Sequence, residues 1–287
     1  MANNRIGLVL EGGGTRGMYT AGVLDVFMEK GITFDATAGV SAGAIHGGTY
    51  IAGQKGRNLR YYKKYCADPR FVSIRNWIKT GDIAGEEFCY HELPDKLDVF
   101  DYKTFRENKT PFYAVCSNIE TGKAEYLRIT DMKKQIDILR ASASLPYFSR
   151  PVEINGKKYL DGGCTDSIPI SGLMKMGYKY NVVVLTRDRN YRKSEEMKLL
   201  AKLVYRKYPE FSKALLNRHN MYNRTVEEIF RLEKSGDIFV IRPENPIDIG
   251  RLEKDPEKLQ TVYDIGYTQA KNILSDMTKW INEKKQA

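Results

Sequence analysis

The sequence predicts an α/β fold, with a mostly parallel central sheet that helices cover on both faces. The main reason is that segments with strand character alternate with amphipathic helical segments along the chain. In addition, Ile6–Leu10 and Asn181–Thr186 are short and almost continuously apolar, which is typical of strands buried in a parallel sheet. The 287 residues, 42% of them apolar, are enough for one large hydrophobic core.

The domain organisation follows from the lack of dividing features in the sequence. No repeat, low-complexity tract or linker separates the chain into parts. We therefore expect a single domain over 1–287, with a core over about 6–186. A helical C-terminal extension over about 187–287 should follow, with a last strand near 238–242.

Two consecutive strand-to-helix turns are expected near the start of the chain. After the strand Ile6–Leu10, a glycine-rich loop leads into a predicted helix over Met18–Lys30. Apolar residues recur on this helix at helical spacing, and Gly31 can end it. An extended run over Thr33–Ala38 then leads into a helix of small residues over Ala44–Ala52, which can pack closely on a sheet.

The rest of the chain alternates between further strands and helices. Residues 53–110 form a helical excursion that is expected to overhang the site as part of a lid. Ser194 and Asp255 are expected to cap helices, the second with Pro256 in the first helical position. The remaining predicted elements are strands over 111–118 and 124–129, a helix over 133–140, a hairpin over 152–160, helices over 194–208 and 211–232, a strand over 238–241 and a final helix that runs toward Trp280.

The second strand-to-helix turn has the pattern of a nucleophile elbow. Its residues are Gly39-Val40-Ser41-Ala42-Gly43, which fit G-x-S-x-G between a strand and a helix. The serine of such a turn occupies a strained backbone conformation, and the flanking glycines avoid collisions with the crossing chain. The alternative is a glycine-rich turn that contains a serine by accident.

The first turn, Glu11 to Gly17, is rich in glycine and admits two interpretations. Backbone N–H groups at the start of the helix can hold an oxyanion formed at Ser41, which would make Gly12, Gly13, Gly14, Arg16 and Gly17 an oxyanion hole. The same residues also fit G-x-G-x-x-G, a dinucleotide fingerprint, for which Asp35 could hold a ribose. That pattern alone is weak, and a nucleotide site does not require a nucleophile turn on the next strand.

A base must accept the proton of the serine hydroxyl. Asp161 follows a strand and precedes Gly162 and Gly163, so it could serve as a rigidly held carboxylate, or belong to an ordinary Asp-Gly-Gly turn. A carboxylate can act directly if partial desolvation raises its basicity. Of the histidines, His46 lies on the elbow helix and points away, and His219 lies in a polar helical segment, where a surface or packing role is expected.

Cysteine spacing and hydropathy indicate in which compartment the protein is expected to work. The four cysteines are far apart and form no C-x-x-C pair, so we expect neither a disulfide framework nor a metal site. No apolar run approaches 18 residues, and no basic-then-apolar leader opens the sequence. We therefore expect a cytoplasmic protein without a membrane span.

The net charge of +10 is concentrated in two stretches. Residues 55–79 contain eight Lys or Arg and one acidic residue, and 187–234 contain thirteen and seven. The first stretch also contains aromatic residues, which together with basic ones are typical of binding to nucleic acid or to anionic membrane surfaces. A solvated basic helix face is the alternative. We expect no nucleic-acid partner and leave a peripheral membrane contact open.

Three motifs together resemble the patatin-like phospholipases, bacterial branch. They are Gly12-Gly13-Gly14-Thr15-Arg16-Gly17, Gly39-Val40-Ser41-Ala42-Gly43 and Asp161-Gly162-Gly163, in the order that the family has them. Softer support comes from the segments Ser117–Gly122 and Ala141–Pro146. The resemblance covers about 6–169 and is thin beyond Arg187, and the family often has Gly-Ala where this chain has Gly162-Gly163.

This resemblance implies a three-layer α/β/α sandwich and a serine acyl-hydrolase that needs no metal or cofactor. Ser41 would be the nucleophile and Asp161 the base of a Ser-Asp dyad that cleaves fatty-acyl esters of lipids through an acyl-enzyme. The loop around Gly13, Gly14 and Arg16 would be the oxyanion hole. Two alternatives remain at this point: a non-catalytic lipid-binding protein on the same fold, and a nucleotide-binding oxidoreductase.

Overall fold

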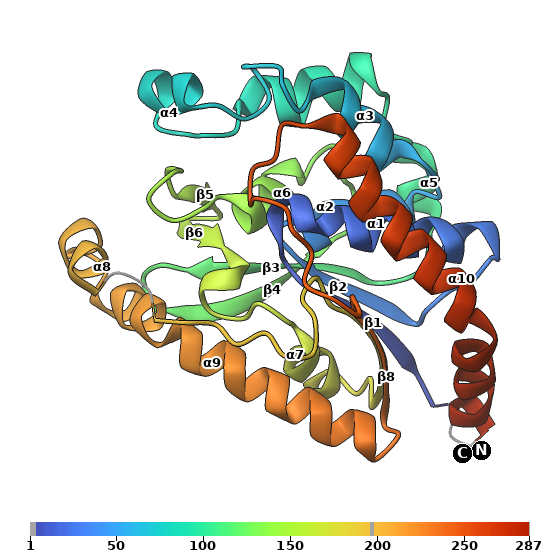
Figure 1. Ribbon diagram of the computed structural model, residues 1–287. Helices are drawn as coiled ribbons and strands as arrows, with labels where there is room; N and C mark the ends of the chain where they lie inside the picture. Colours follow the sequence, from blue (N-terminus) through green and yellow to red (C-terminus); the bar gives the residue numbers. More distant parts are fainter. Residues whose placement is uncertain (1–3, 196–197, 287) are drawn as a thin grey trace.

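The computed structural model describes residues 4–195 and 198–286, and within them one mixed sheet forms the centre (Figure 1). The strands lie in the order β5-β6-β3-β2-β1-β7-β8, and β4 pairs with β3 outside this path. The pairings among β3, β2, β1, β7 and β8 are parallel, and those of β4, β5 and β6 are antiparallel. The strands are β1 (Ile6–Leu10), β2 (Ala36–Val40), β3 (Phe112–Asn118), β4 (Lys123–Ile129), β5 (Val152–Ile154), β6 (Lys157–Asp161), β7 (Tyr180–Val184) and β8 (Ile238–Ile241).

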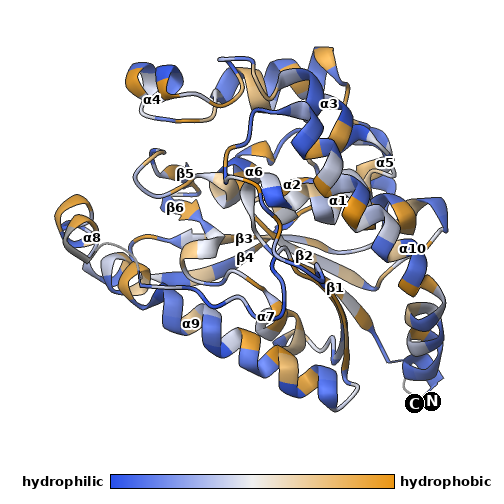
Figure 2. Ribbon diagram, in the orientation of Figure 1, coloured by the Kyte–Doolittle hydropathy of each residue, from blue (hydrophilic) through white to orange (hydrophobic). Residues whose placement is uncertain are grey.

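Helices cover both faces of the sheet, which confirms the predicted three-layer α/β/α architecture with a mostly parallel sheet. One face is covered by α1 (Gly17–Glu29), α2 (Ala42–Ile51), α6 (Ile136–Ala143) and α10 (Pro256–Gln286). The other is covered by α7 (Ile170–Lys175) and α9 (Pro209–Lys234). In Figure 2, α9 and α10 carry both hydrophobic and hydrophilic residues, as expected of helices with one buried face.

The direction in which successive strands are placed in the sheet changes at β1. It passes from β1 to β2 and β3 on one side, then returns to place β7 and β8 on the other. The carboxyl ends of β1, β2 and β7 therefore border one crevice, the usual position of a binding site in an open α/β sheet. Both the glycine-rich loop and the serine turn begin at this edge.

A cap stands over the first helical layer and consists of residues 57–107. Its elements are α3 (Arg57–Tyr65), α4 (Ile74–Thr80), the π-helical segment η2 (Phe88–Leu97) and α5 (Tyr102–Glu107). Aromatic residues of α3 and η2 form a small core of their own. This is the segment that was expected to overhang the site.

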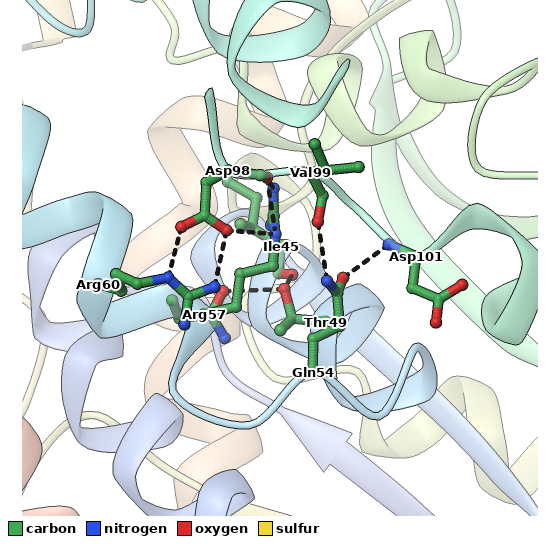
Figure 3. A network of polar contacts seen from close by, with 9 residues as sticks. Ile45, Thr49, Gln54, Arg57, Arg60, Asp98, Val99 and Asp101 are labelled. Carbon is green, nitrogen blue, oxygen red and sulfur yellow. Dashed lines mark hydrogen bonds and ion pairs between the residues drawn. The ribbon is translucent and has the colours of Figure 1, made fainter. Parts of the chain in front are cut away.

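A polar network joins the chain that follows η2 to α3 and to the loop after α2 (Figure 3). The buried Arg57 lies 3.3 Å (Nε to Oδ1) from Asp98, and its guanidinium also donates to the Asp98 backbone carbonyl. Arg60 donates to the same carboxylate from the surface. The Gln54 amide donates to Val99 O and accepts from the N–H of Asp101. The chain between η2 and α5 is thereby held at Asp98, Val99 and Asp101.

The predicted helix over 194–208 differs from the structure. Residues 187–195 form an irregular loop, 196 and 197 lie outside the described residues, and α8 covers only Lys198–Val204. The backbone of Lys193 exchanges two hydrogen bonds with the side chain of Asn223, which fixes this loop to α9. Pro209 then begins α9, and it biases Tyr208 away from helical geometry. The C-terminal extension therefore begins as a loop, and its strand β8 ends at Ile241 rather than 242.

Among the described residues, no helix combines the length and the apolar character that crossing a bilayer requires.

Candidate active site

Ser41 lies on the sharp turn between β2 and α2, with φ 54° and ψ −122°. This is a left-handed conformation that residues other than glycine rarely adopt, and it projects the serine from the edge of the sheet. A Cβ on Gly39 would lie 2.5 Å from Gly43 O, and one on Gly43 would lie 2.5 Å from Leu10 O. Both glycines are therefore required by the close packing of the turn, as the elbow pattern predicts.

Ser142 of α6 holds the backbone of the serine turn through hydrogen bonds. The Ser41 N–H donates to Ser142 Oγ at 3.0 Å, and this hydroxyl donates to Val115 O at 2.7 Å. Ser142 is fully buried, so the chain of hydrogen bonds fixes the nucleophile turn to β3 and α6. The sequence analysis included this residue only in a family segment and assigned it no role.

The structure brings Asp161 to Ser41. Asp161 ends β6, and its carboxylate accepts a 2.7 Å hydrogen bond from the N–H of Gly163. Burial raises the pKa of this carboxyl group, against a hydrogen bond with the Ser41 hydroxyl, the Gly163 N–H and the charges of Arg218 and Arg251. Gly162 and Gly163 form a short turn behind it, which Arg218 fixes by donating to Gly163 O. A desolvated carboxylate beside a hydroxyl has the arrangement of a general base.

The glycine-rich loop lies beside the same serine. The N–H of Gly12 donates to Ser167 O, and that of Gly17 donates to Gly14 O, so these two donors already have partners. Within the described part of the chain, neither the Gly13 nor the Gly14 N–H has an acceptor. The N–H groups of Gly13 and Gly14 are therefore the donors of this loop that are open to a ligand, and the oxyanion hole stays a prediction.

Histidine does not contribute to this site. His46 is completely buried on α2, and burial lowers its pKa to about 4, so the ring is neutral. Among the described residues, neither of the two cavities that contain Ser41 is lined by His46 or His219. A histidine-based triad is therefore not assembled.

Asp35 also lies away from the site. Its carboxylate accepts a hydrogen bond from the N–H of Ile6, at the beginning of β1, whereas the glycine-rich loop follows the end of that strand. A ribose bound at the loop would be out of reach of Asp35, which argues against the dinucleotide alternative.

Ser41 opens into an apolar cavity between α2, α6 and the cap. The cavity has about 1070 Å³ of space, including its open mouth. Its walls are mainly aliphatic and aromatic, and its lining includes Ile45, Tyr61, Phe71, Leu93, Phe100, Met132 and Leu139. Such a space suits a hydrocarbon chain.

On its other side, Ser41 borders a smaller, polar pocket of about 560 Å³. Asp161 and the glycine-rich loop line this pocket, together with residues of the C-terminal extension. Its basic side chains are Arg16, Arg187, Lys193, Arg218 and Arg251. Of these five residues, only Arg16 was expected from the sequence to lie at the site.

Among the described residues, no group of three or more metal-ligating side chains lies together.

A serine on a nucleophile elbow, with a buried carboxyl group and glycine N–H groups beside it, is the arrangement expected of an α/β hydrolase. The comparison with protein families agrees: the family model of the patatin-like phospholipases matches residues 8–174, and the chain belongs to this family. Family membership supports a lipid ester hydrolase. Residues 208–282 match a second family model, described as a domain of unknown function (DUF6363).

Individual relatives extend the likeness over nearly the whole chain. The uncharacterized protein YjjU of Escherichia coli is 27% identical over 290 residues, which cover 98% of this chain and 80% of that protein. Lysophospholipase NTE1 of Scheffersomyces stipitis is 26% identical, over 97% of this chain but only 18% of its own length. The chain thus spans about a fifth of that relative. The solved structure of VipD from Legionella pneumophila has a TM-score of 0.45 and 15% identity, over 95% of this chain and 67% of that one.

Proposed function

We propose that the protein is a serine acyl-hydrolase that cleaves fatty-acyl esters of phospholipids or lysophospholipids through a Ser41–Asp161 dyad. The observation that carries the proposal is the position of the Ser41 hydroxyl. It interacts with a buried carboxylate, lies beside two free backbone donors and opens into an apolar cavity. The lysophospholipase name of several relatives supports the same substrate class.

In the proposed reaction, Ser41 Oγ attacks the ester carbonyl while Asp161 accepts the hydroxyl proton. The N–H groups of Gly13 and Gly14 hold the oxyanion of the tetrahedral intermediate. Collapse of this intermediate breaks the ester bond, and the proton on Asp161 passes to the leaving alcohol. Asp161 then takes a proton from water, which attacks the acyl-enzyme. Collapse of the second tetrahedral intermediate breaks the bond to Ser41 Oγ and releases the fatty acid, and Asp161 returns the proton to Ser41 Oγ.

The acyl chain would occupy the apolar cavity under the cap. Residues of η2 and α3 form one wall of this cavity, and α6 forms part of another. Because the cap supplies much of the cavity lining and has a small aromatic core of its own, it is the segment that we propose as the lid.

The proposal includes a membrane contact at α4, which lies in the sequence between Val72 and Ile83, two residues that line the cavity. Ile74, Trp77 and Ile78 are exposed, and the Trp77 ring lies 6.1 Å from that of the exposed Phe148. Arg75 and Lys79 stand on the same short helix. An aromatic and aliphatic surface with basic neighbours suits an anionic bilayer. With four unbridged cysteines, we propose a reducing, cytoplasmic setting.

Labelling with a fluorophosphonate probe, followed by hydrolysis of a panel of lipids, tests the function. We expect wild-type protein to be labelled and Ser41→Ala to be neither labelled nor active. Binding to liposomes without labelling of wild-type protein would instead indicate a lipid-binding protein without catalysis.

A further inference from the structure

We propose that the basic pocket beside Ser41 binds the phosphate monoester head group of the lipid substrate, so that the enzyme prefers acyl esters with a terminal phosphate to those with phosphocholine. The inference rests on the proposed function and specifies its substrate class. Arg16, Arg187 and Arg251 carry it.

The first observation is that a buried cation in this pocket lacks a partner. Arg16 is only 9% exposed, and its Nε has no hydrogen-bond partner within the described part of the chain. Burying a cation is costly unless its charge is compensated, and an anion bound in the pocket that Arg16 lines would compensate it. The nearby Glu11 carboxylate is already engaged by Thr186 and Tyr222.

The second observation is that basic side chains predominate in the pocket, whose lining contains five of them and the two carboxyl groups of Glu11 and Asp161. Burial lowers the pKa of Arg16 to about 10, with the charges of Arg187 and Arg251 contributing and that of Glu11 opposing. Arg187 and Arg251 come from loops far apart in the sequence, yet both line the pocket. Such a gathering of guanidinium groups is suited to a phosphate, which offers several acceptor oxygens and close to two negative charges.

The two contributing loops are held in place without any ligand. The Arg187 guanidinium lies 4.1 Å from the centre of the Tyr191 ring, and the following backbone is fixed to α9 by Asn223. The Arg251 carbonyl accepts the N–H of Thr15 at 3.1 Å, which joins its loop to the glycine-rich loop. The pocket is therefore preorganised, which limits the entropy lost on binding.

The third observation is the position of the pocket relative to the reaction. Gly14, Ser41, Leu145 and Arg251 line both the apolar cavity and the basic pocket. An ester carbonyl at Ser41 would thus have its acyl chain on one side and its head group on the other. A quaternary ammonium group would meet like charges there, which disfavours phosphocholine. Arg187 and Arg251 lie beyond residue 174, outside the patatin-like match, and Arg251 falls within the second matched region, 208–282.

The test is isothermal titration of the full chain carrying Ser41→Ala, which cannot turn over the ligand. The ligands are hexanoyl lysophosphatidic acid, hexanoyl lysophosphatidylcholine and inorganic phosphate, the lipids below their micelle concentrations. We expect the phosphomonoester to bind about tenfold or more tightly than the choline lipid. Adding Arg187→Gln or Arg251→Gln should remove most of this preference. Arg189→Gln is the matched control, because Arg189 is on the same loop but lies over Phe230.

Equal affinity for the two lipids would overturn the proposal, as would a preference that survives in both folded arginine variants, with folding checked by circular dichroism. Inorganic phosphate that binds as tightly as the phosphomonoester lipid would show an anion site unconnected with the ester. The proposed function can fail without the head-group proposal. If wild-type protein binds the phosphomonoester lipid but is not labelled by the fluorophosphonate, the head-group site is supported and the hydrolase function is not.

Discussion

Replacing Asp161 with asparagine should preserve the fold and remove most of the esterase activity. Asparagine has the same shape, and its side-chain oxygen can still accept the hydrogen bond from Gly163 N–H. It cannot accept the Ser41 proton at neutral pH. A positioned general base contributes about 10²–10⁴-fold to rate, or about 3–5 kcal/mol of transition-state stabilisation. We expect kcat/KM to fall by about 10³-fold.

The assay is hydrolysis of p-nitrophenyl butyrate by wild type, Asp161→Asn, Ser41→Ala and the double variant. Because the two residues act as a unit, the double variant should be no slower than Ser41→Ala. Thermal unfolding of each protein controls for misfolding. A folded Asp161→Asn protein with kcat/KM within about threefold of wild type would refute the assignment of Asp161 as the base.

The pH profile examines the same carboxylate in the wild-type enzyme. The base must be ionised, so kcat/KM should rise with pH through the pKa of Asp161. Burial raises that pKa above 3.8, so the midpoint of the rise should lie above the ordinary aspartate value. Asp166 is a second carboxyl group whose ionisation could cause the rise in kcat/KM, because burial raises its pKa to about 6. A rise that disappears in Asp166→Asn would contradict the assignment to Asp161.

Two further predictions concern the cap and the membrane contact. Asp98→Ala should lower the free energy of unfolding by about 3 kcal/mol, because it leaves the buried Arg57 without its carboxylate. Arg60→Ala should lower it by less than about 1 kcal/mol, because Arg60 is exposed. Urea unfolding measures both values. Equal losses in the two variants would show that the buried pair is not the source. Trp77→Ser should reduce sedimentation with anionic vesicles several-fold, while hydrolysis of a soluble ester continues, because Trp77 packs on Phe148 at the surface. Unchanged vesicle binding would exclude α4 as the contact.

The elements nearest the site could be predicted from the sequence because local chemistry determines them. Gly39 and Gly43 are required by contacts within one turn, and strand ends place Ser41 and Asp161 at an edge of the sheet. The order of motifs then indicated the family, which the comparison confirms.

The remaining features depend on contacts between distant segments. The loop at 187–195 is fixed to α9 by Asn223, which lies thirty residues beyond Lys193 and bonds to its backbone. Arg187 and Arg251 are brought beside Arg16 by loops that follow different strands. No local pattern distinguishes these arginines from the other basic residues of the extension.

The sheet order has a practical consequence for anyone who expresses part of this protein. A fragment that stops at residue 174, where the patatin-like match ends, would lack β7, the parallel neighbour of β1. The strand that leads into the glycine-rich loop would then be an unpaired edge, prone to aggregation. Its Glu11 would also lose Thr186 and Tyr222. Residues outside the recognised family region thus complete the folding unit, and deletion mapping that stops at this boundary would mistake misfolding for loss of catalysis.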